Sequence, residues 1–266
     1  MKIALMDSGI GLLAAAAALR RMRPDADLVL SSDPDGMPWG PRTPEDVTEH
    51  ALACARAAAA HGPDALIVAC NTASVHALPA LRAELEPSIP VIGTVPAIKP
   101  AAAAARTVAI WATPATTGSR YQRDLIRDFG NGATVTEVPC PGLADAVDRA
   151  DEAATAAAIA AAAALTPADA EAVVLGCTHY ELVADRIRAA LDTTAPLFGS
   201  ADAVAAQTLR RIGAAPAPAD APTGGLAVIL SGRPGAFTPQ ALAYAEGRYL
   251  ADAASSAAAS GAAPVL

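Results

Sequence analysis

The sequence is short of aromatic and charged residues, which make up 3% and 17% of its 266 positions. It also lacks a basic excess, because 19 Lys and Arg stand against 27 Asp and Glu and give a formal net charge of -8. An acidic chain does not offer the positive surface that binds nucleic acid or an anionic membrane. We therefore expect a small-molecule partner, with no membrane and no nucleic acid bound directly.

Export signals and disulfide frameworks are missing as well. The apolar run at residues 3–6 ends at Asp7, which is too short for a signal-peptide core or a membrane span. Four cysteines in 266 residues are too few for a disulfide scaffold. The sequence thus predicts a cytoplasmic protein with reduced thiols.

What the sequence does contain is a regular alternation of strand and helix patterns. Residues 2–6, 25–31 and 65–69 have apolar strand patterns, whereas residues 12–23 have a helical composition. A further helix is expected to begin after Thr43, which is followed by proline and two acids, and to end at Gly62. This alternation is typical of βαβ units and a mainly parallel sheet.

An internal repeat indicates that the α/β unit occurs twice. Residues 64–72 match residues 171–179, 90–94 match 196–200, and 3–8 match 108–113, at offsets of 107, 106 and 105 positions. The sequence therefore predicts two pseudo-symmetric Rossmann-like lobes, each a mainly parallel sheet flanked by helices, with an active site in the cleft between them.

The repeat also suggests where the lobes begin and end. We expect the first lobe to comprise residues 1–95 and 207–250, and the second to comprise residues 96–206. Residues 213–225 resemble an irregular connection, after which a strand at 226–230 and a helix at 238–250 return to the first lobe. Residues 251–266 form a low-complexity tail of alanine and serine.

Each copy of the repeat carries a cysteine where an apolar strand ends. Cys70 is followed by Asn71 and Thr72, and Cys177 by Thr178 and His179. Ligands of parallel α/β sheets bind at the carboxyl ends of the strands, and the start of a helix favours a thiolate. Two opposed thiols can invert a stereocentre without a cofactor, one removing the α-proton and the other returning a proton to the opposite face. Their sulfurs would then lie about 6 to 8 Å apart.

The structural alternatives are considered for each candidate. A single cysteine at a strand end is usually a small buried hydrophobe, and only the pairing in the repeat favours catalysis. Cys54 and Cys140 have no such pairing and are interpreted as structural, and the spacing matches no zinc pattern. Asp7 and Ser8 could bind substrate or cap the next helix. His179 follows a candidate cysteine closely, whereas His50, His61 and His76 have no supporting residues.

Several motifs together resemble the glutamate racemases of the aspartate/glutamate racemase superfamily, and they cover residues 2–200, with a weaker match at Ser231 and Gly232. They are Asp7-Ser8-Gly9, Pro38-Trp39-Gly40, Ala69-Cys70-Asn71-Thr72-Ala73-Ser74, Pro96-Ala97-Ile98-Lys99-Pro100, Ala112-Thr113 and Gly176-Cys177-Thr178-His179-Tyr180.

The resemblance implies an enzyme that supplies D-glutamate for peptidoglycan, needs neither a cofactor nor a metal, and is often a homodimer. Cys70 would handle the proton on the D-face and Cys177 the proton on the L-face, with Asp7 and His179 assisting. The substrate, an acidic amino acid, would be contacted by Asp7, Ser8, Trp39, Gly40, Asn71, Thr72, Thr116, Thr178 and His179.

Three residues depart from the family pattern. The family usually has tyrosine where Trp39 stands, glutamate where Asp148 stands and proline where Glu181 stands. These departures keep aspartate or another acidic amino acid open as the substrate. A maleate-isomerase-like reaction and a non-catalytic binding protein are the remaining alternatives.

Overall fold

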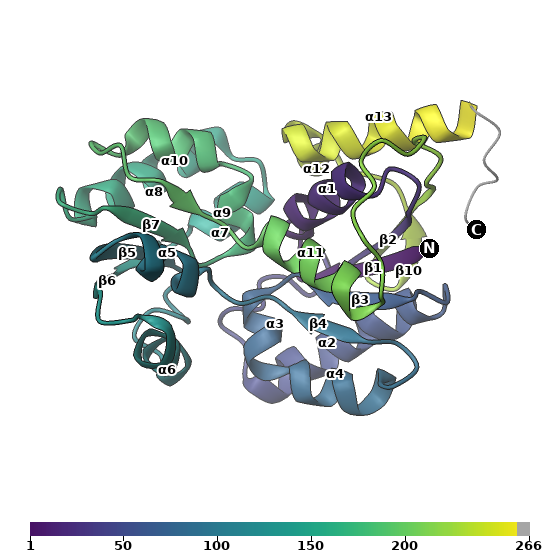
Figure 1. Cartoon of the computed structure of the whole chain (residues 1–266), viewed down its shortest axis with the longest axis horizontal. Coiled ribbons are helices and arrows are strands. Elements are labelled where there is room, and N and C mark those ends of the chain that lie inside the picture. Colours follow the sequence, from purple (N-terminus) through teal and green to yellow (C-terminus); the bar gives the residue numbers. More distant parts are fainter. Residues whose placement is uncertain (260–266) are drawn as a thin grey trace. The chain divides into compact units, whose positions relative to one another are not determined.

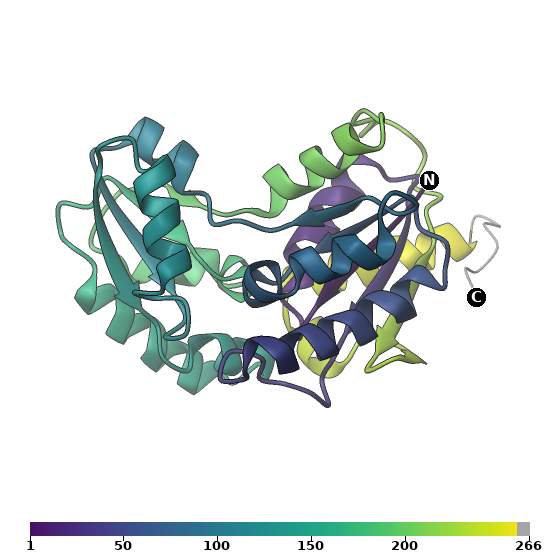
Figure 2. The ribbon, with the colours of Figure 1, turned by 90° about the horizontal axis from the view of Figure 1, so that it is seen from below.

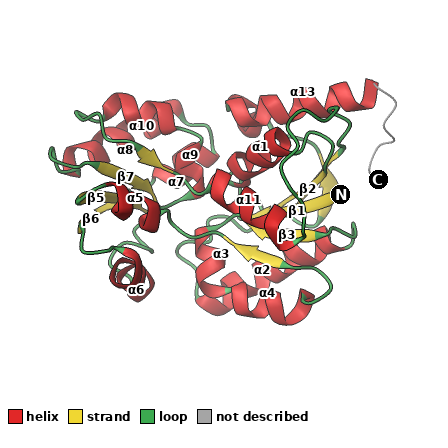
Figure 3. Cartoon of the chain, in the orientation of Figure 1, coloured by secondary structure: helices red, strands yellow, loops and turns green. Residues whose placement is uncertain are grey.

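The computed structural model describes residues 1–259, which form two compact units (Figure 1). The first unit contains Met1–Thr94 and the described residues from Ala201 onward, and the second contains Val95–Ser200. In both units helices surround the strands, which confirms the predicted α/β fold (Figure 3). The second boundary lies at Ser200 rather than 206, because the helix that begins at Ala201 packs against the first helix of the first unit.

The first unit is built on a six-stranded sheet with the order β10-β9-β2-β1-β3-β4, in which only β10 runs antiparallel to its neighbour. Its strands are β1 (Lys2–Asp7), β2 (Asp27–Ser32), β3 (Ala65–Val68), β4 (Val91–Gly93), β9 (Leu226–Leu230) and β10 (Arg233–Gly235). Its helices are α1 (Leu12–Met22), α2 (Pro44–Ala59), α3 (Asn71–His76), α4 (Leu78–Leu85), α11 (Ala201–Arg211), α12 (Pro239–Ala243) and α13 (Ala245–Ala259).

Helices cover both faces of this sheet. Helices α1, α11 and α13 lie on one face, and α2, α3 and α4 lie on the other (Figure 1). Seen from below, α2 and α4 lie side by side (Figure 2). Alanines on α2 pack against Met6, Leu66 and Val68 in one buried cluster, so small side chains let this helix approach the strands closely.

Local signals explain where α2 begins. The Thr43 hydroxyl accepts a hydrogen bond from the Asp46 amide at 3.3 Å, and Pro44 occupies the first turn, where its missing N–H costs nothing. Glu45 and Asp46 complement the positive end of the helix dipole. The predicted start of this helix is therefore confirmed.

The second unit is built on a four-stranded parallel sheet with the order β6-β5-β7-β8. Its strands are β5 (Thr107–Ala112), β6 (Thr134–Pro139), β7 (Ala172–Leu175) and β8 (Leu197–Phe198). Its helices are α5 (Ile98–Ala104), α6 (Arg120–Phe129), α7 (Leu143–Asp148), α8 (Glu152–Leu165), α9 (Thr178–Glu181) and α10 (Ala184–Ala190). Apolar side chains of α5 and α6 pack with those of β5 and β7 in one buried cluster.

The repeat seen in the sequence corresponds to equivalent strands with the same register. Strands β2-β1-β3-β4 of the first sheet correspond in order to β6-β5-β7-β8 of the second. Ile3 pairs with Ala65 in one sheet, and Val108 pairs with Ala172 in the other, at the offsets that the sequence match predicts. The duplication therefore extends to individual backbone pairs.

The C-terminal segment differs from the prediction. The helix expected at residues 238–250 is two helices, because Tyr244 has an extended backbone between α12 and α13. Gly247 allows the second helix to begin there, since a Cβ on it would lie 2.0 Å from the carbonyl oxygen of Ala241. Helix α13 also continues to residue 259, into the predicted tail, while residues 260–266 lie outside the described part. No helix within residues 1–259 is long and apolar enough to cross a membrane.

Candidate active site

The turn after β1 brings Asp7 and Ser8 next to the first candidate thiol. Asp7 is fully buried, and its carboxylate accepts a hydrogen bond from the Ser8 amide at 2.7 Å. The Ser8 hydroxyl lies 3.3 Å from the same carboxylate and 4.0 Å from Cys70 Sγ. Because β1 and β3 are parallel neighbours, their carboxyl ends meet at one edge of the sheet. Three of the predicted site residues are thus neighbours.

Cys70 occupies the N-cap position of α3. Its backbone is extended, and its side chain is 6% exposed. Asn71, the first helical residue, is also buried, and Thr72 is half-buried. The turn is fixed to the sheet by the hydrogen bond from the Ala69 amide to the Met6 carbonyl at 2.8 Å. A thiol at a helix start next to polar side chains is a suitable acid or base.

Cys177 has the equivalent position in the second unit. It is the N-cap of α9, has an extended backbone and is 9% exposed. The Gly176 amide bonds to the Trp111 carbonyl at 2.7 Å, as Ala69 does to Met6. Its neighbours Thr178 and His179 are buried. Both thiols therefore stand in the same backbone setting.

A thiol, an imidazole and a carboxylate form a chain of contacts in the second unit. Cys177 Sγ lies 3.8 Å from His179 Nδ1, and His179 Nε2 lies 3.2 Å from Asp148 Oδ1. His179 is 4% exposed, so its ring is oriented by these partners rather than by water. The array can stabilise a charge on the thiol or on the imidazole when a proton moves.

Trp39 is buried and belongs to a network that the sequence did not reveal. Its indole N–H donates to Asp33 Oδ2 at 3.2 Å, and His50 Nδ1 lies 2.7 Å from the same oxygen. The Ser231 hydroxyl donates to Asp33 Oδ1 at 2.9 Å, while the Asp33 amide donates to the Ser8 carbonyl at 3.1 Å. Asp33 thus connects the Trp39 loop, α2 and the β9–β10 turn to Ser8, which directly follows Asp7.

Two expectations change because of this network. His50 was expected to have no supporting residues, and this is wrong, because it contacts Asp33 and lies 3.5 Å from Asp46. Ser231 and Gly232, the weak match at the end of the sequence, form the positive-φ turn between β9 and β10. No local motif around Asp33 indicates its partners, since these come from three separate segments. Gly40 follows Trp39 and is half-buried.

The remaining residues are Thr116, a predicted substrate contact, and Cys54 and Cys140, which were interpreted as structural. Thr116 is buried after β5, and its hydroxyl lies 3.2 Å from that of Thr113. Burial raises the pKa of the Cys54 thiol to about 12 and that of the Cys140 thiol to about 12. A thiol with such a pKa stays protonated near neutral pH, which agrees with a structural role for both cysteines. Within the described residues, no cluster of three or more His, Cys, Asp or Glu side chains is arranged to hold a metal ion.

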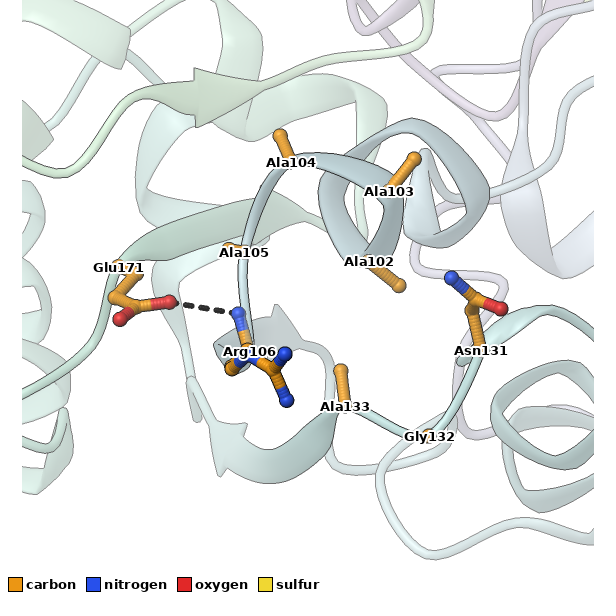
Figure 4. A pocket seen from close by; sticks show the side chains of 9 residues that line it. All are labelled: Ala102, Ala103, Ala104, Ala105, Arg106, Asn131, Gly132, Ala133 and Glu171. Atoms are coloured by element: carbon orange, nitrogen blue, oxygen red, sulfur yellow. Dashed lines mark hydrogen bonds between the residues drawn. The ribbon is translucent and has the colours of Figure 1, made fainter.

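A pocket of about 460 Å³ lies at the opposite edge of the second sheet (Figure 4). It is lined by the end of α5, the turn at 131–133 and Glu171, whose carboxylate accepts a hydrogen bond from the Arg106 amide at 2.6 Å. These residues precede β5, β6 and β7, whereas Cys177 follows β7. The pocket is therefore separate from the candidate thiol.

Known proteins resemble this chain over most of its length. It is 37% identical to the glutamate racemase of Roseiflexus sp. strain RS-1 over 208 residues, which is 76% of each chain. It is 34% identical to the glutamate racemase of Pseudomonas putida strain F1 over 84% of this chain and 85% of that one. The crystal structure of Escherichia coli glutamate racemase with L-glutamate and the activator UDP-MurNAc-ala matches with a TM-score of 0.76 and 28% identity, covering 94% of this chain and 92% of that chain.

These similarities define the class of the protein as an isomerase, and within the isomerases as a racemase built on two α/β units. The model of the Asp/Glu/Hydantoin racemase family matches residues 11–208. The chain belongs to this family, and the resemblance inferred from the sequence motifs is confirmed.

Proposed function

We propose that the chain is a glutamate racemase that interconverts L- and D-glutamate by proton transfer between Cys70 and Cys177. The observation that carries the proposal is the equivalence of the two thiols: each is the buried N-cap residue that follows the same strand of the duplicated sheet. The names of the relatives, and the L-glutamate in the E. coli structure, support glutamate as the substrate.

The proposed reaction is a two-step exchange of protons. The Cys177 thiolate removes the α-proton of L-glutamate, and the electron pair of the broken C–H bond passes to the α-carbon and its carboxylate. The Cys70 thiol then donates its proton to the opposite face, which gives D-glutamate and leaves Cys70 as the thiolate. The reverse reaction begins from that state, so no external acid, base or cofactor is consumed.

Neighbouring residues divide into two supporting groups. Asp7 and Ser8 assist proton transfer by Cys70, whereas His179 and Asp148 assist proton transfer by Cys177. This division follows from their contacts. Asn71, Thr72, Thr116, Thr178 and the Trp39-Gly40 backbone would hold the ammonium and carboxylate groups. The mechanism requires the two units to present their thiols to opposite faces of one α-carbon. In the cell, the product would enter peptidoglycan synthesis in the cytoplasm.

The test is α-deuterium exchange. Incubation with L-glutamate in deuterated water should produce D-glutamate, which circular dichroism measures. The α-proton signal in the NMR spectrum should disappear at the same time. Cys70→Ser and Cys177→Ser should each stop the interconversion, because one face then lacks its acid or base. Cys54→Ala and Cys140→Ala are matched controls in the same two units and should racemise normally if they remain folded. The proposal would be overturned if no acidic amino acid exchanged its α-proton.

Parallel incubations decide between the substrates. Aspartate is included because Trp39 and Asp148 depart from the family pattern, and faster exchange of aspartate than of glutamate would replace the proposed substrate. Light scattering on the same preparation measures whether the protein forms the homodimer that its family suggests.

A further inference from the structure

The second match of the repeat has no part in the proposed proton transfer. It pairs residues 90–94 with 196–200, and in the structure these are β4 and β8 with the residues that flank them. Each strand is the neighbour of the strand that precedes a candidate cysteine. Thr94 and Ser200 are also the residues at which the chain leaves one unit for the other. This location calls for a structural explanation of the match.

In the first unit, Ser74 joins the thiol-bearing turn to the end of β4. Ser74 stands four residues after Cys70, and its hydroxyl accepts a hydrogen bond from the Thr94 amide at 2.9 Å. The same hydroxyl lies 3.3 Å from the Val68 carbonyl, which also accepts the Thr94 hydroxyl at 2.8 Å. The end of β3, helix α3 and the residue after β4 are therefore connected by three hydrogen bonds.

In the second unit, Glu181 takes the equivalent place. Glu181 stands four residues after Cys177, and its Oε1 accepts hydrogen bonds from the Ser200 amide and the Ser200 hydroxyl, both at 2.8 Å. The Ser200 amide is thus bonded by a carboxylate, and the equivalent Thr94 amide by a hydroxyl. The sequence alone presents Glu181 only as a departure from the proline of the family.

The glycines in this match leave room for different side chains, Gly199 for Glu181 and Gly93 for Leu78. A Cβ on Gly199 would lie 2.3 Å from Glu181 Oε2, and a Cβ on Gly93 would lie 3.5 Å from Ser74 Oγ and 2.8 Å from Leu78 Cδ2. Neither glycine has a positive φ, so space rather than backbone conformation explains them. The two sites therefore share a glycine, an acceptor side chain and a buried amide.

We infer that Ser74 and Glu181 are equivalent positioning residues, each of which fastens the thiol-bearing turn of its own unit to the strand end beside it. The effect of these two residues on the rate of turnover rests on the proposed racemase function. Their effect on the position of each thiol is independent of that function. Helix α9 has only four residues and carries Thr178 and His179, so a contact at its last residue sets the orientation of the whole turn. Displacement of a reacting group by about 1 Å can cost on the order of 100-fold in rate.

The test compares the two thiols of the same molecule. Glu181→Ala and Ser74→Ala are treated with iodoacetamide, and the alkylation rate of each cysteine is measured by peptide mass spectrometry. Glu181→Ala should raise the rate of Cys177 severalfold and leave Cys70 unchanged, and Ser74→Ala should do the reverse. Glu181→Gln and Ser74→Thr keep an oxygen acceptor and should behave like the parent. If the protein is a racemase, kcat should fall by about tenfold in both alanine variants.

Gly199→Ala supplies a second, independent measurement. The added methyl group would displace the Glu181 carboxylate, so this variant should also raise the alkylation rate of Cys177. In a Glu181→Ala background the same change should have little further effect, because the group that it displaces is gone. Melting curves identify any variant that has simply lost its fold.

Two results would overturn the inference. One is an unchanged Cys177 rate in both Glu181→Ala and Gly199→Ala. The other is an equal rise at both cysteines in every variant, which would indicate general loosening. Failure of the racemase proposal has a different signature, namely no α-proton exchange by the parent, and the alkylation rates remain decisive in that case.

Discussion

Replacing Asp33 with alanine should loosen the first unit and release the Trp39 indole. The Asp33 carboxylate accepts hydrogen bonds from the Trp39 indole at 3.2 Å and the Ser231 hydroxyl at 2.9 Å, and it lies 2.7 Å from His50 Nδ1. Asp33 itself is 7% exposed. Alanine removes all three contacts, while the backbone bond from residue 33 to the Ser8 carbonyl can remain.

The size of the effect follows from which partners can reach water. Trp39 is 2% exposed, so its N–H would be left unpaired at a cost of about 1 to 3 kcal/mol. His50 and Ser231 are half-buried and can be rehydrated, which limits their loss to about 1 kcal/mol each. The sum is about 3 to 5 kcal/mol, a large part of the stability of one domain. Asp33→Asn keeps one acceptor oxygen and should lose about half as much.

The assay has to report on each unit separately. The chain has two tryptophans, Trp39 in the first unit and Trp111 in the second, so 5-fluorotryptophan labelling gives one ¹⁹F signal for each. With a urea dependence of about 2 kcal/mol per molar, the midpoint of the Trp39 signal should fall by about 1.5 to 2.5 M. The native Trp39 signal should also move, whereas the native Trp111 signal should not.

Asp35→Ala is the matched control. Asp35 is exposed, and its ion pair with the exposed Arg233 contributes less than about 1 kcal/mol. A Trp39 midpoint in Asp33→Ala within about 0.3 M of the parent, or equal to that of Asp35→Ala, would refute the reasoning.

Two further predictions concern groups outside the candidate site. Because burial raises the pKa of Cys54 and of Cys140 to about 12, only the unfolded chain loses these thiol protons between about pH 9 and 12. Their contribution to stability is complete below pH 9 and declines above it. The urea midpoint of unfolding should therefore fall as the pH rises from about 9 to 12. The fall should be smaller in a variant that carries both Cys54→Ala and Cys140→Ala. Arg20→Met should lower the urea midpoint of the first unit, because the buried Arg20 guanidinium donates to the carbonyls of Pro24, Ala26 and Gly225; an unchanged midpoint would contradict this.

The sequence predicted the features that repeat. Strand and helix alternation gave the α/β class, and the three matches anticipated the equivalent strands down to their register. The same repeat singled out Cys70 and Cys177, whose common backbone setting the structure reveals. These features were accessible because they depend on short apolar runs and on spacing along the chain.

Contacts between distant segments were not predictable in this way. Asp33 gathers partners from its own loop, from α2 and from the β9–β10 turn, and nothing in its neighbouring residues indicates three donors. The break at Tyr244 was missed because residues 238–250 have a helical composition throughout, and only packing of Gly247 against Ala241 distinguishes two helices. Tertiary packing decided both cases.

Two of the three departures from the family pattern, Asp148 and Trp39, can now be interpreted physically. Asp148 is one methylene shorter than the glutamate usual in the family, yet its carboxylate lies 3.2 Å from His179 Nε2, so the shorter side chain still reaches the imidazole. Trp39 directs its N–H to Asp33 and is buried among apolar residues that include Cys70. Each departure therefore has a partner within its own unit. A difference in substrate preference would have to arise from the space that these side chains leave, which is why glutamate and aspartate must be compared in the unaltered protein.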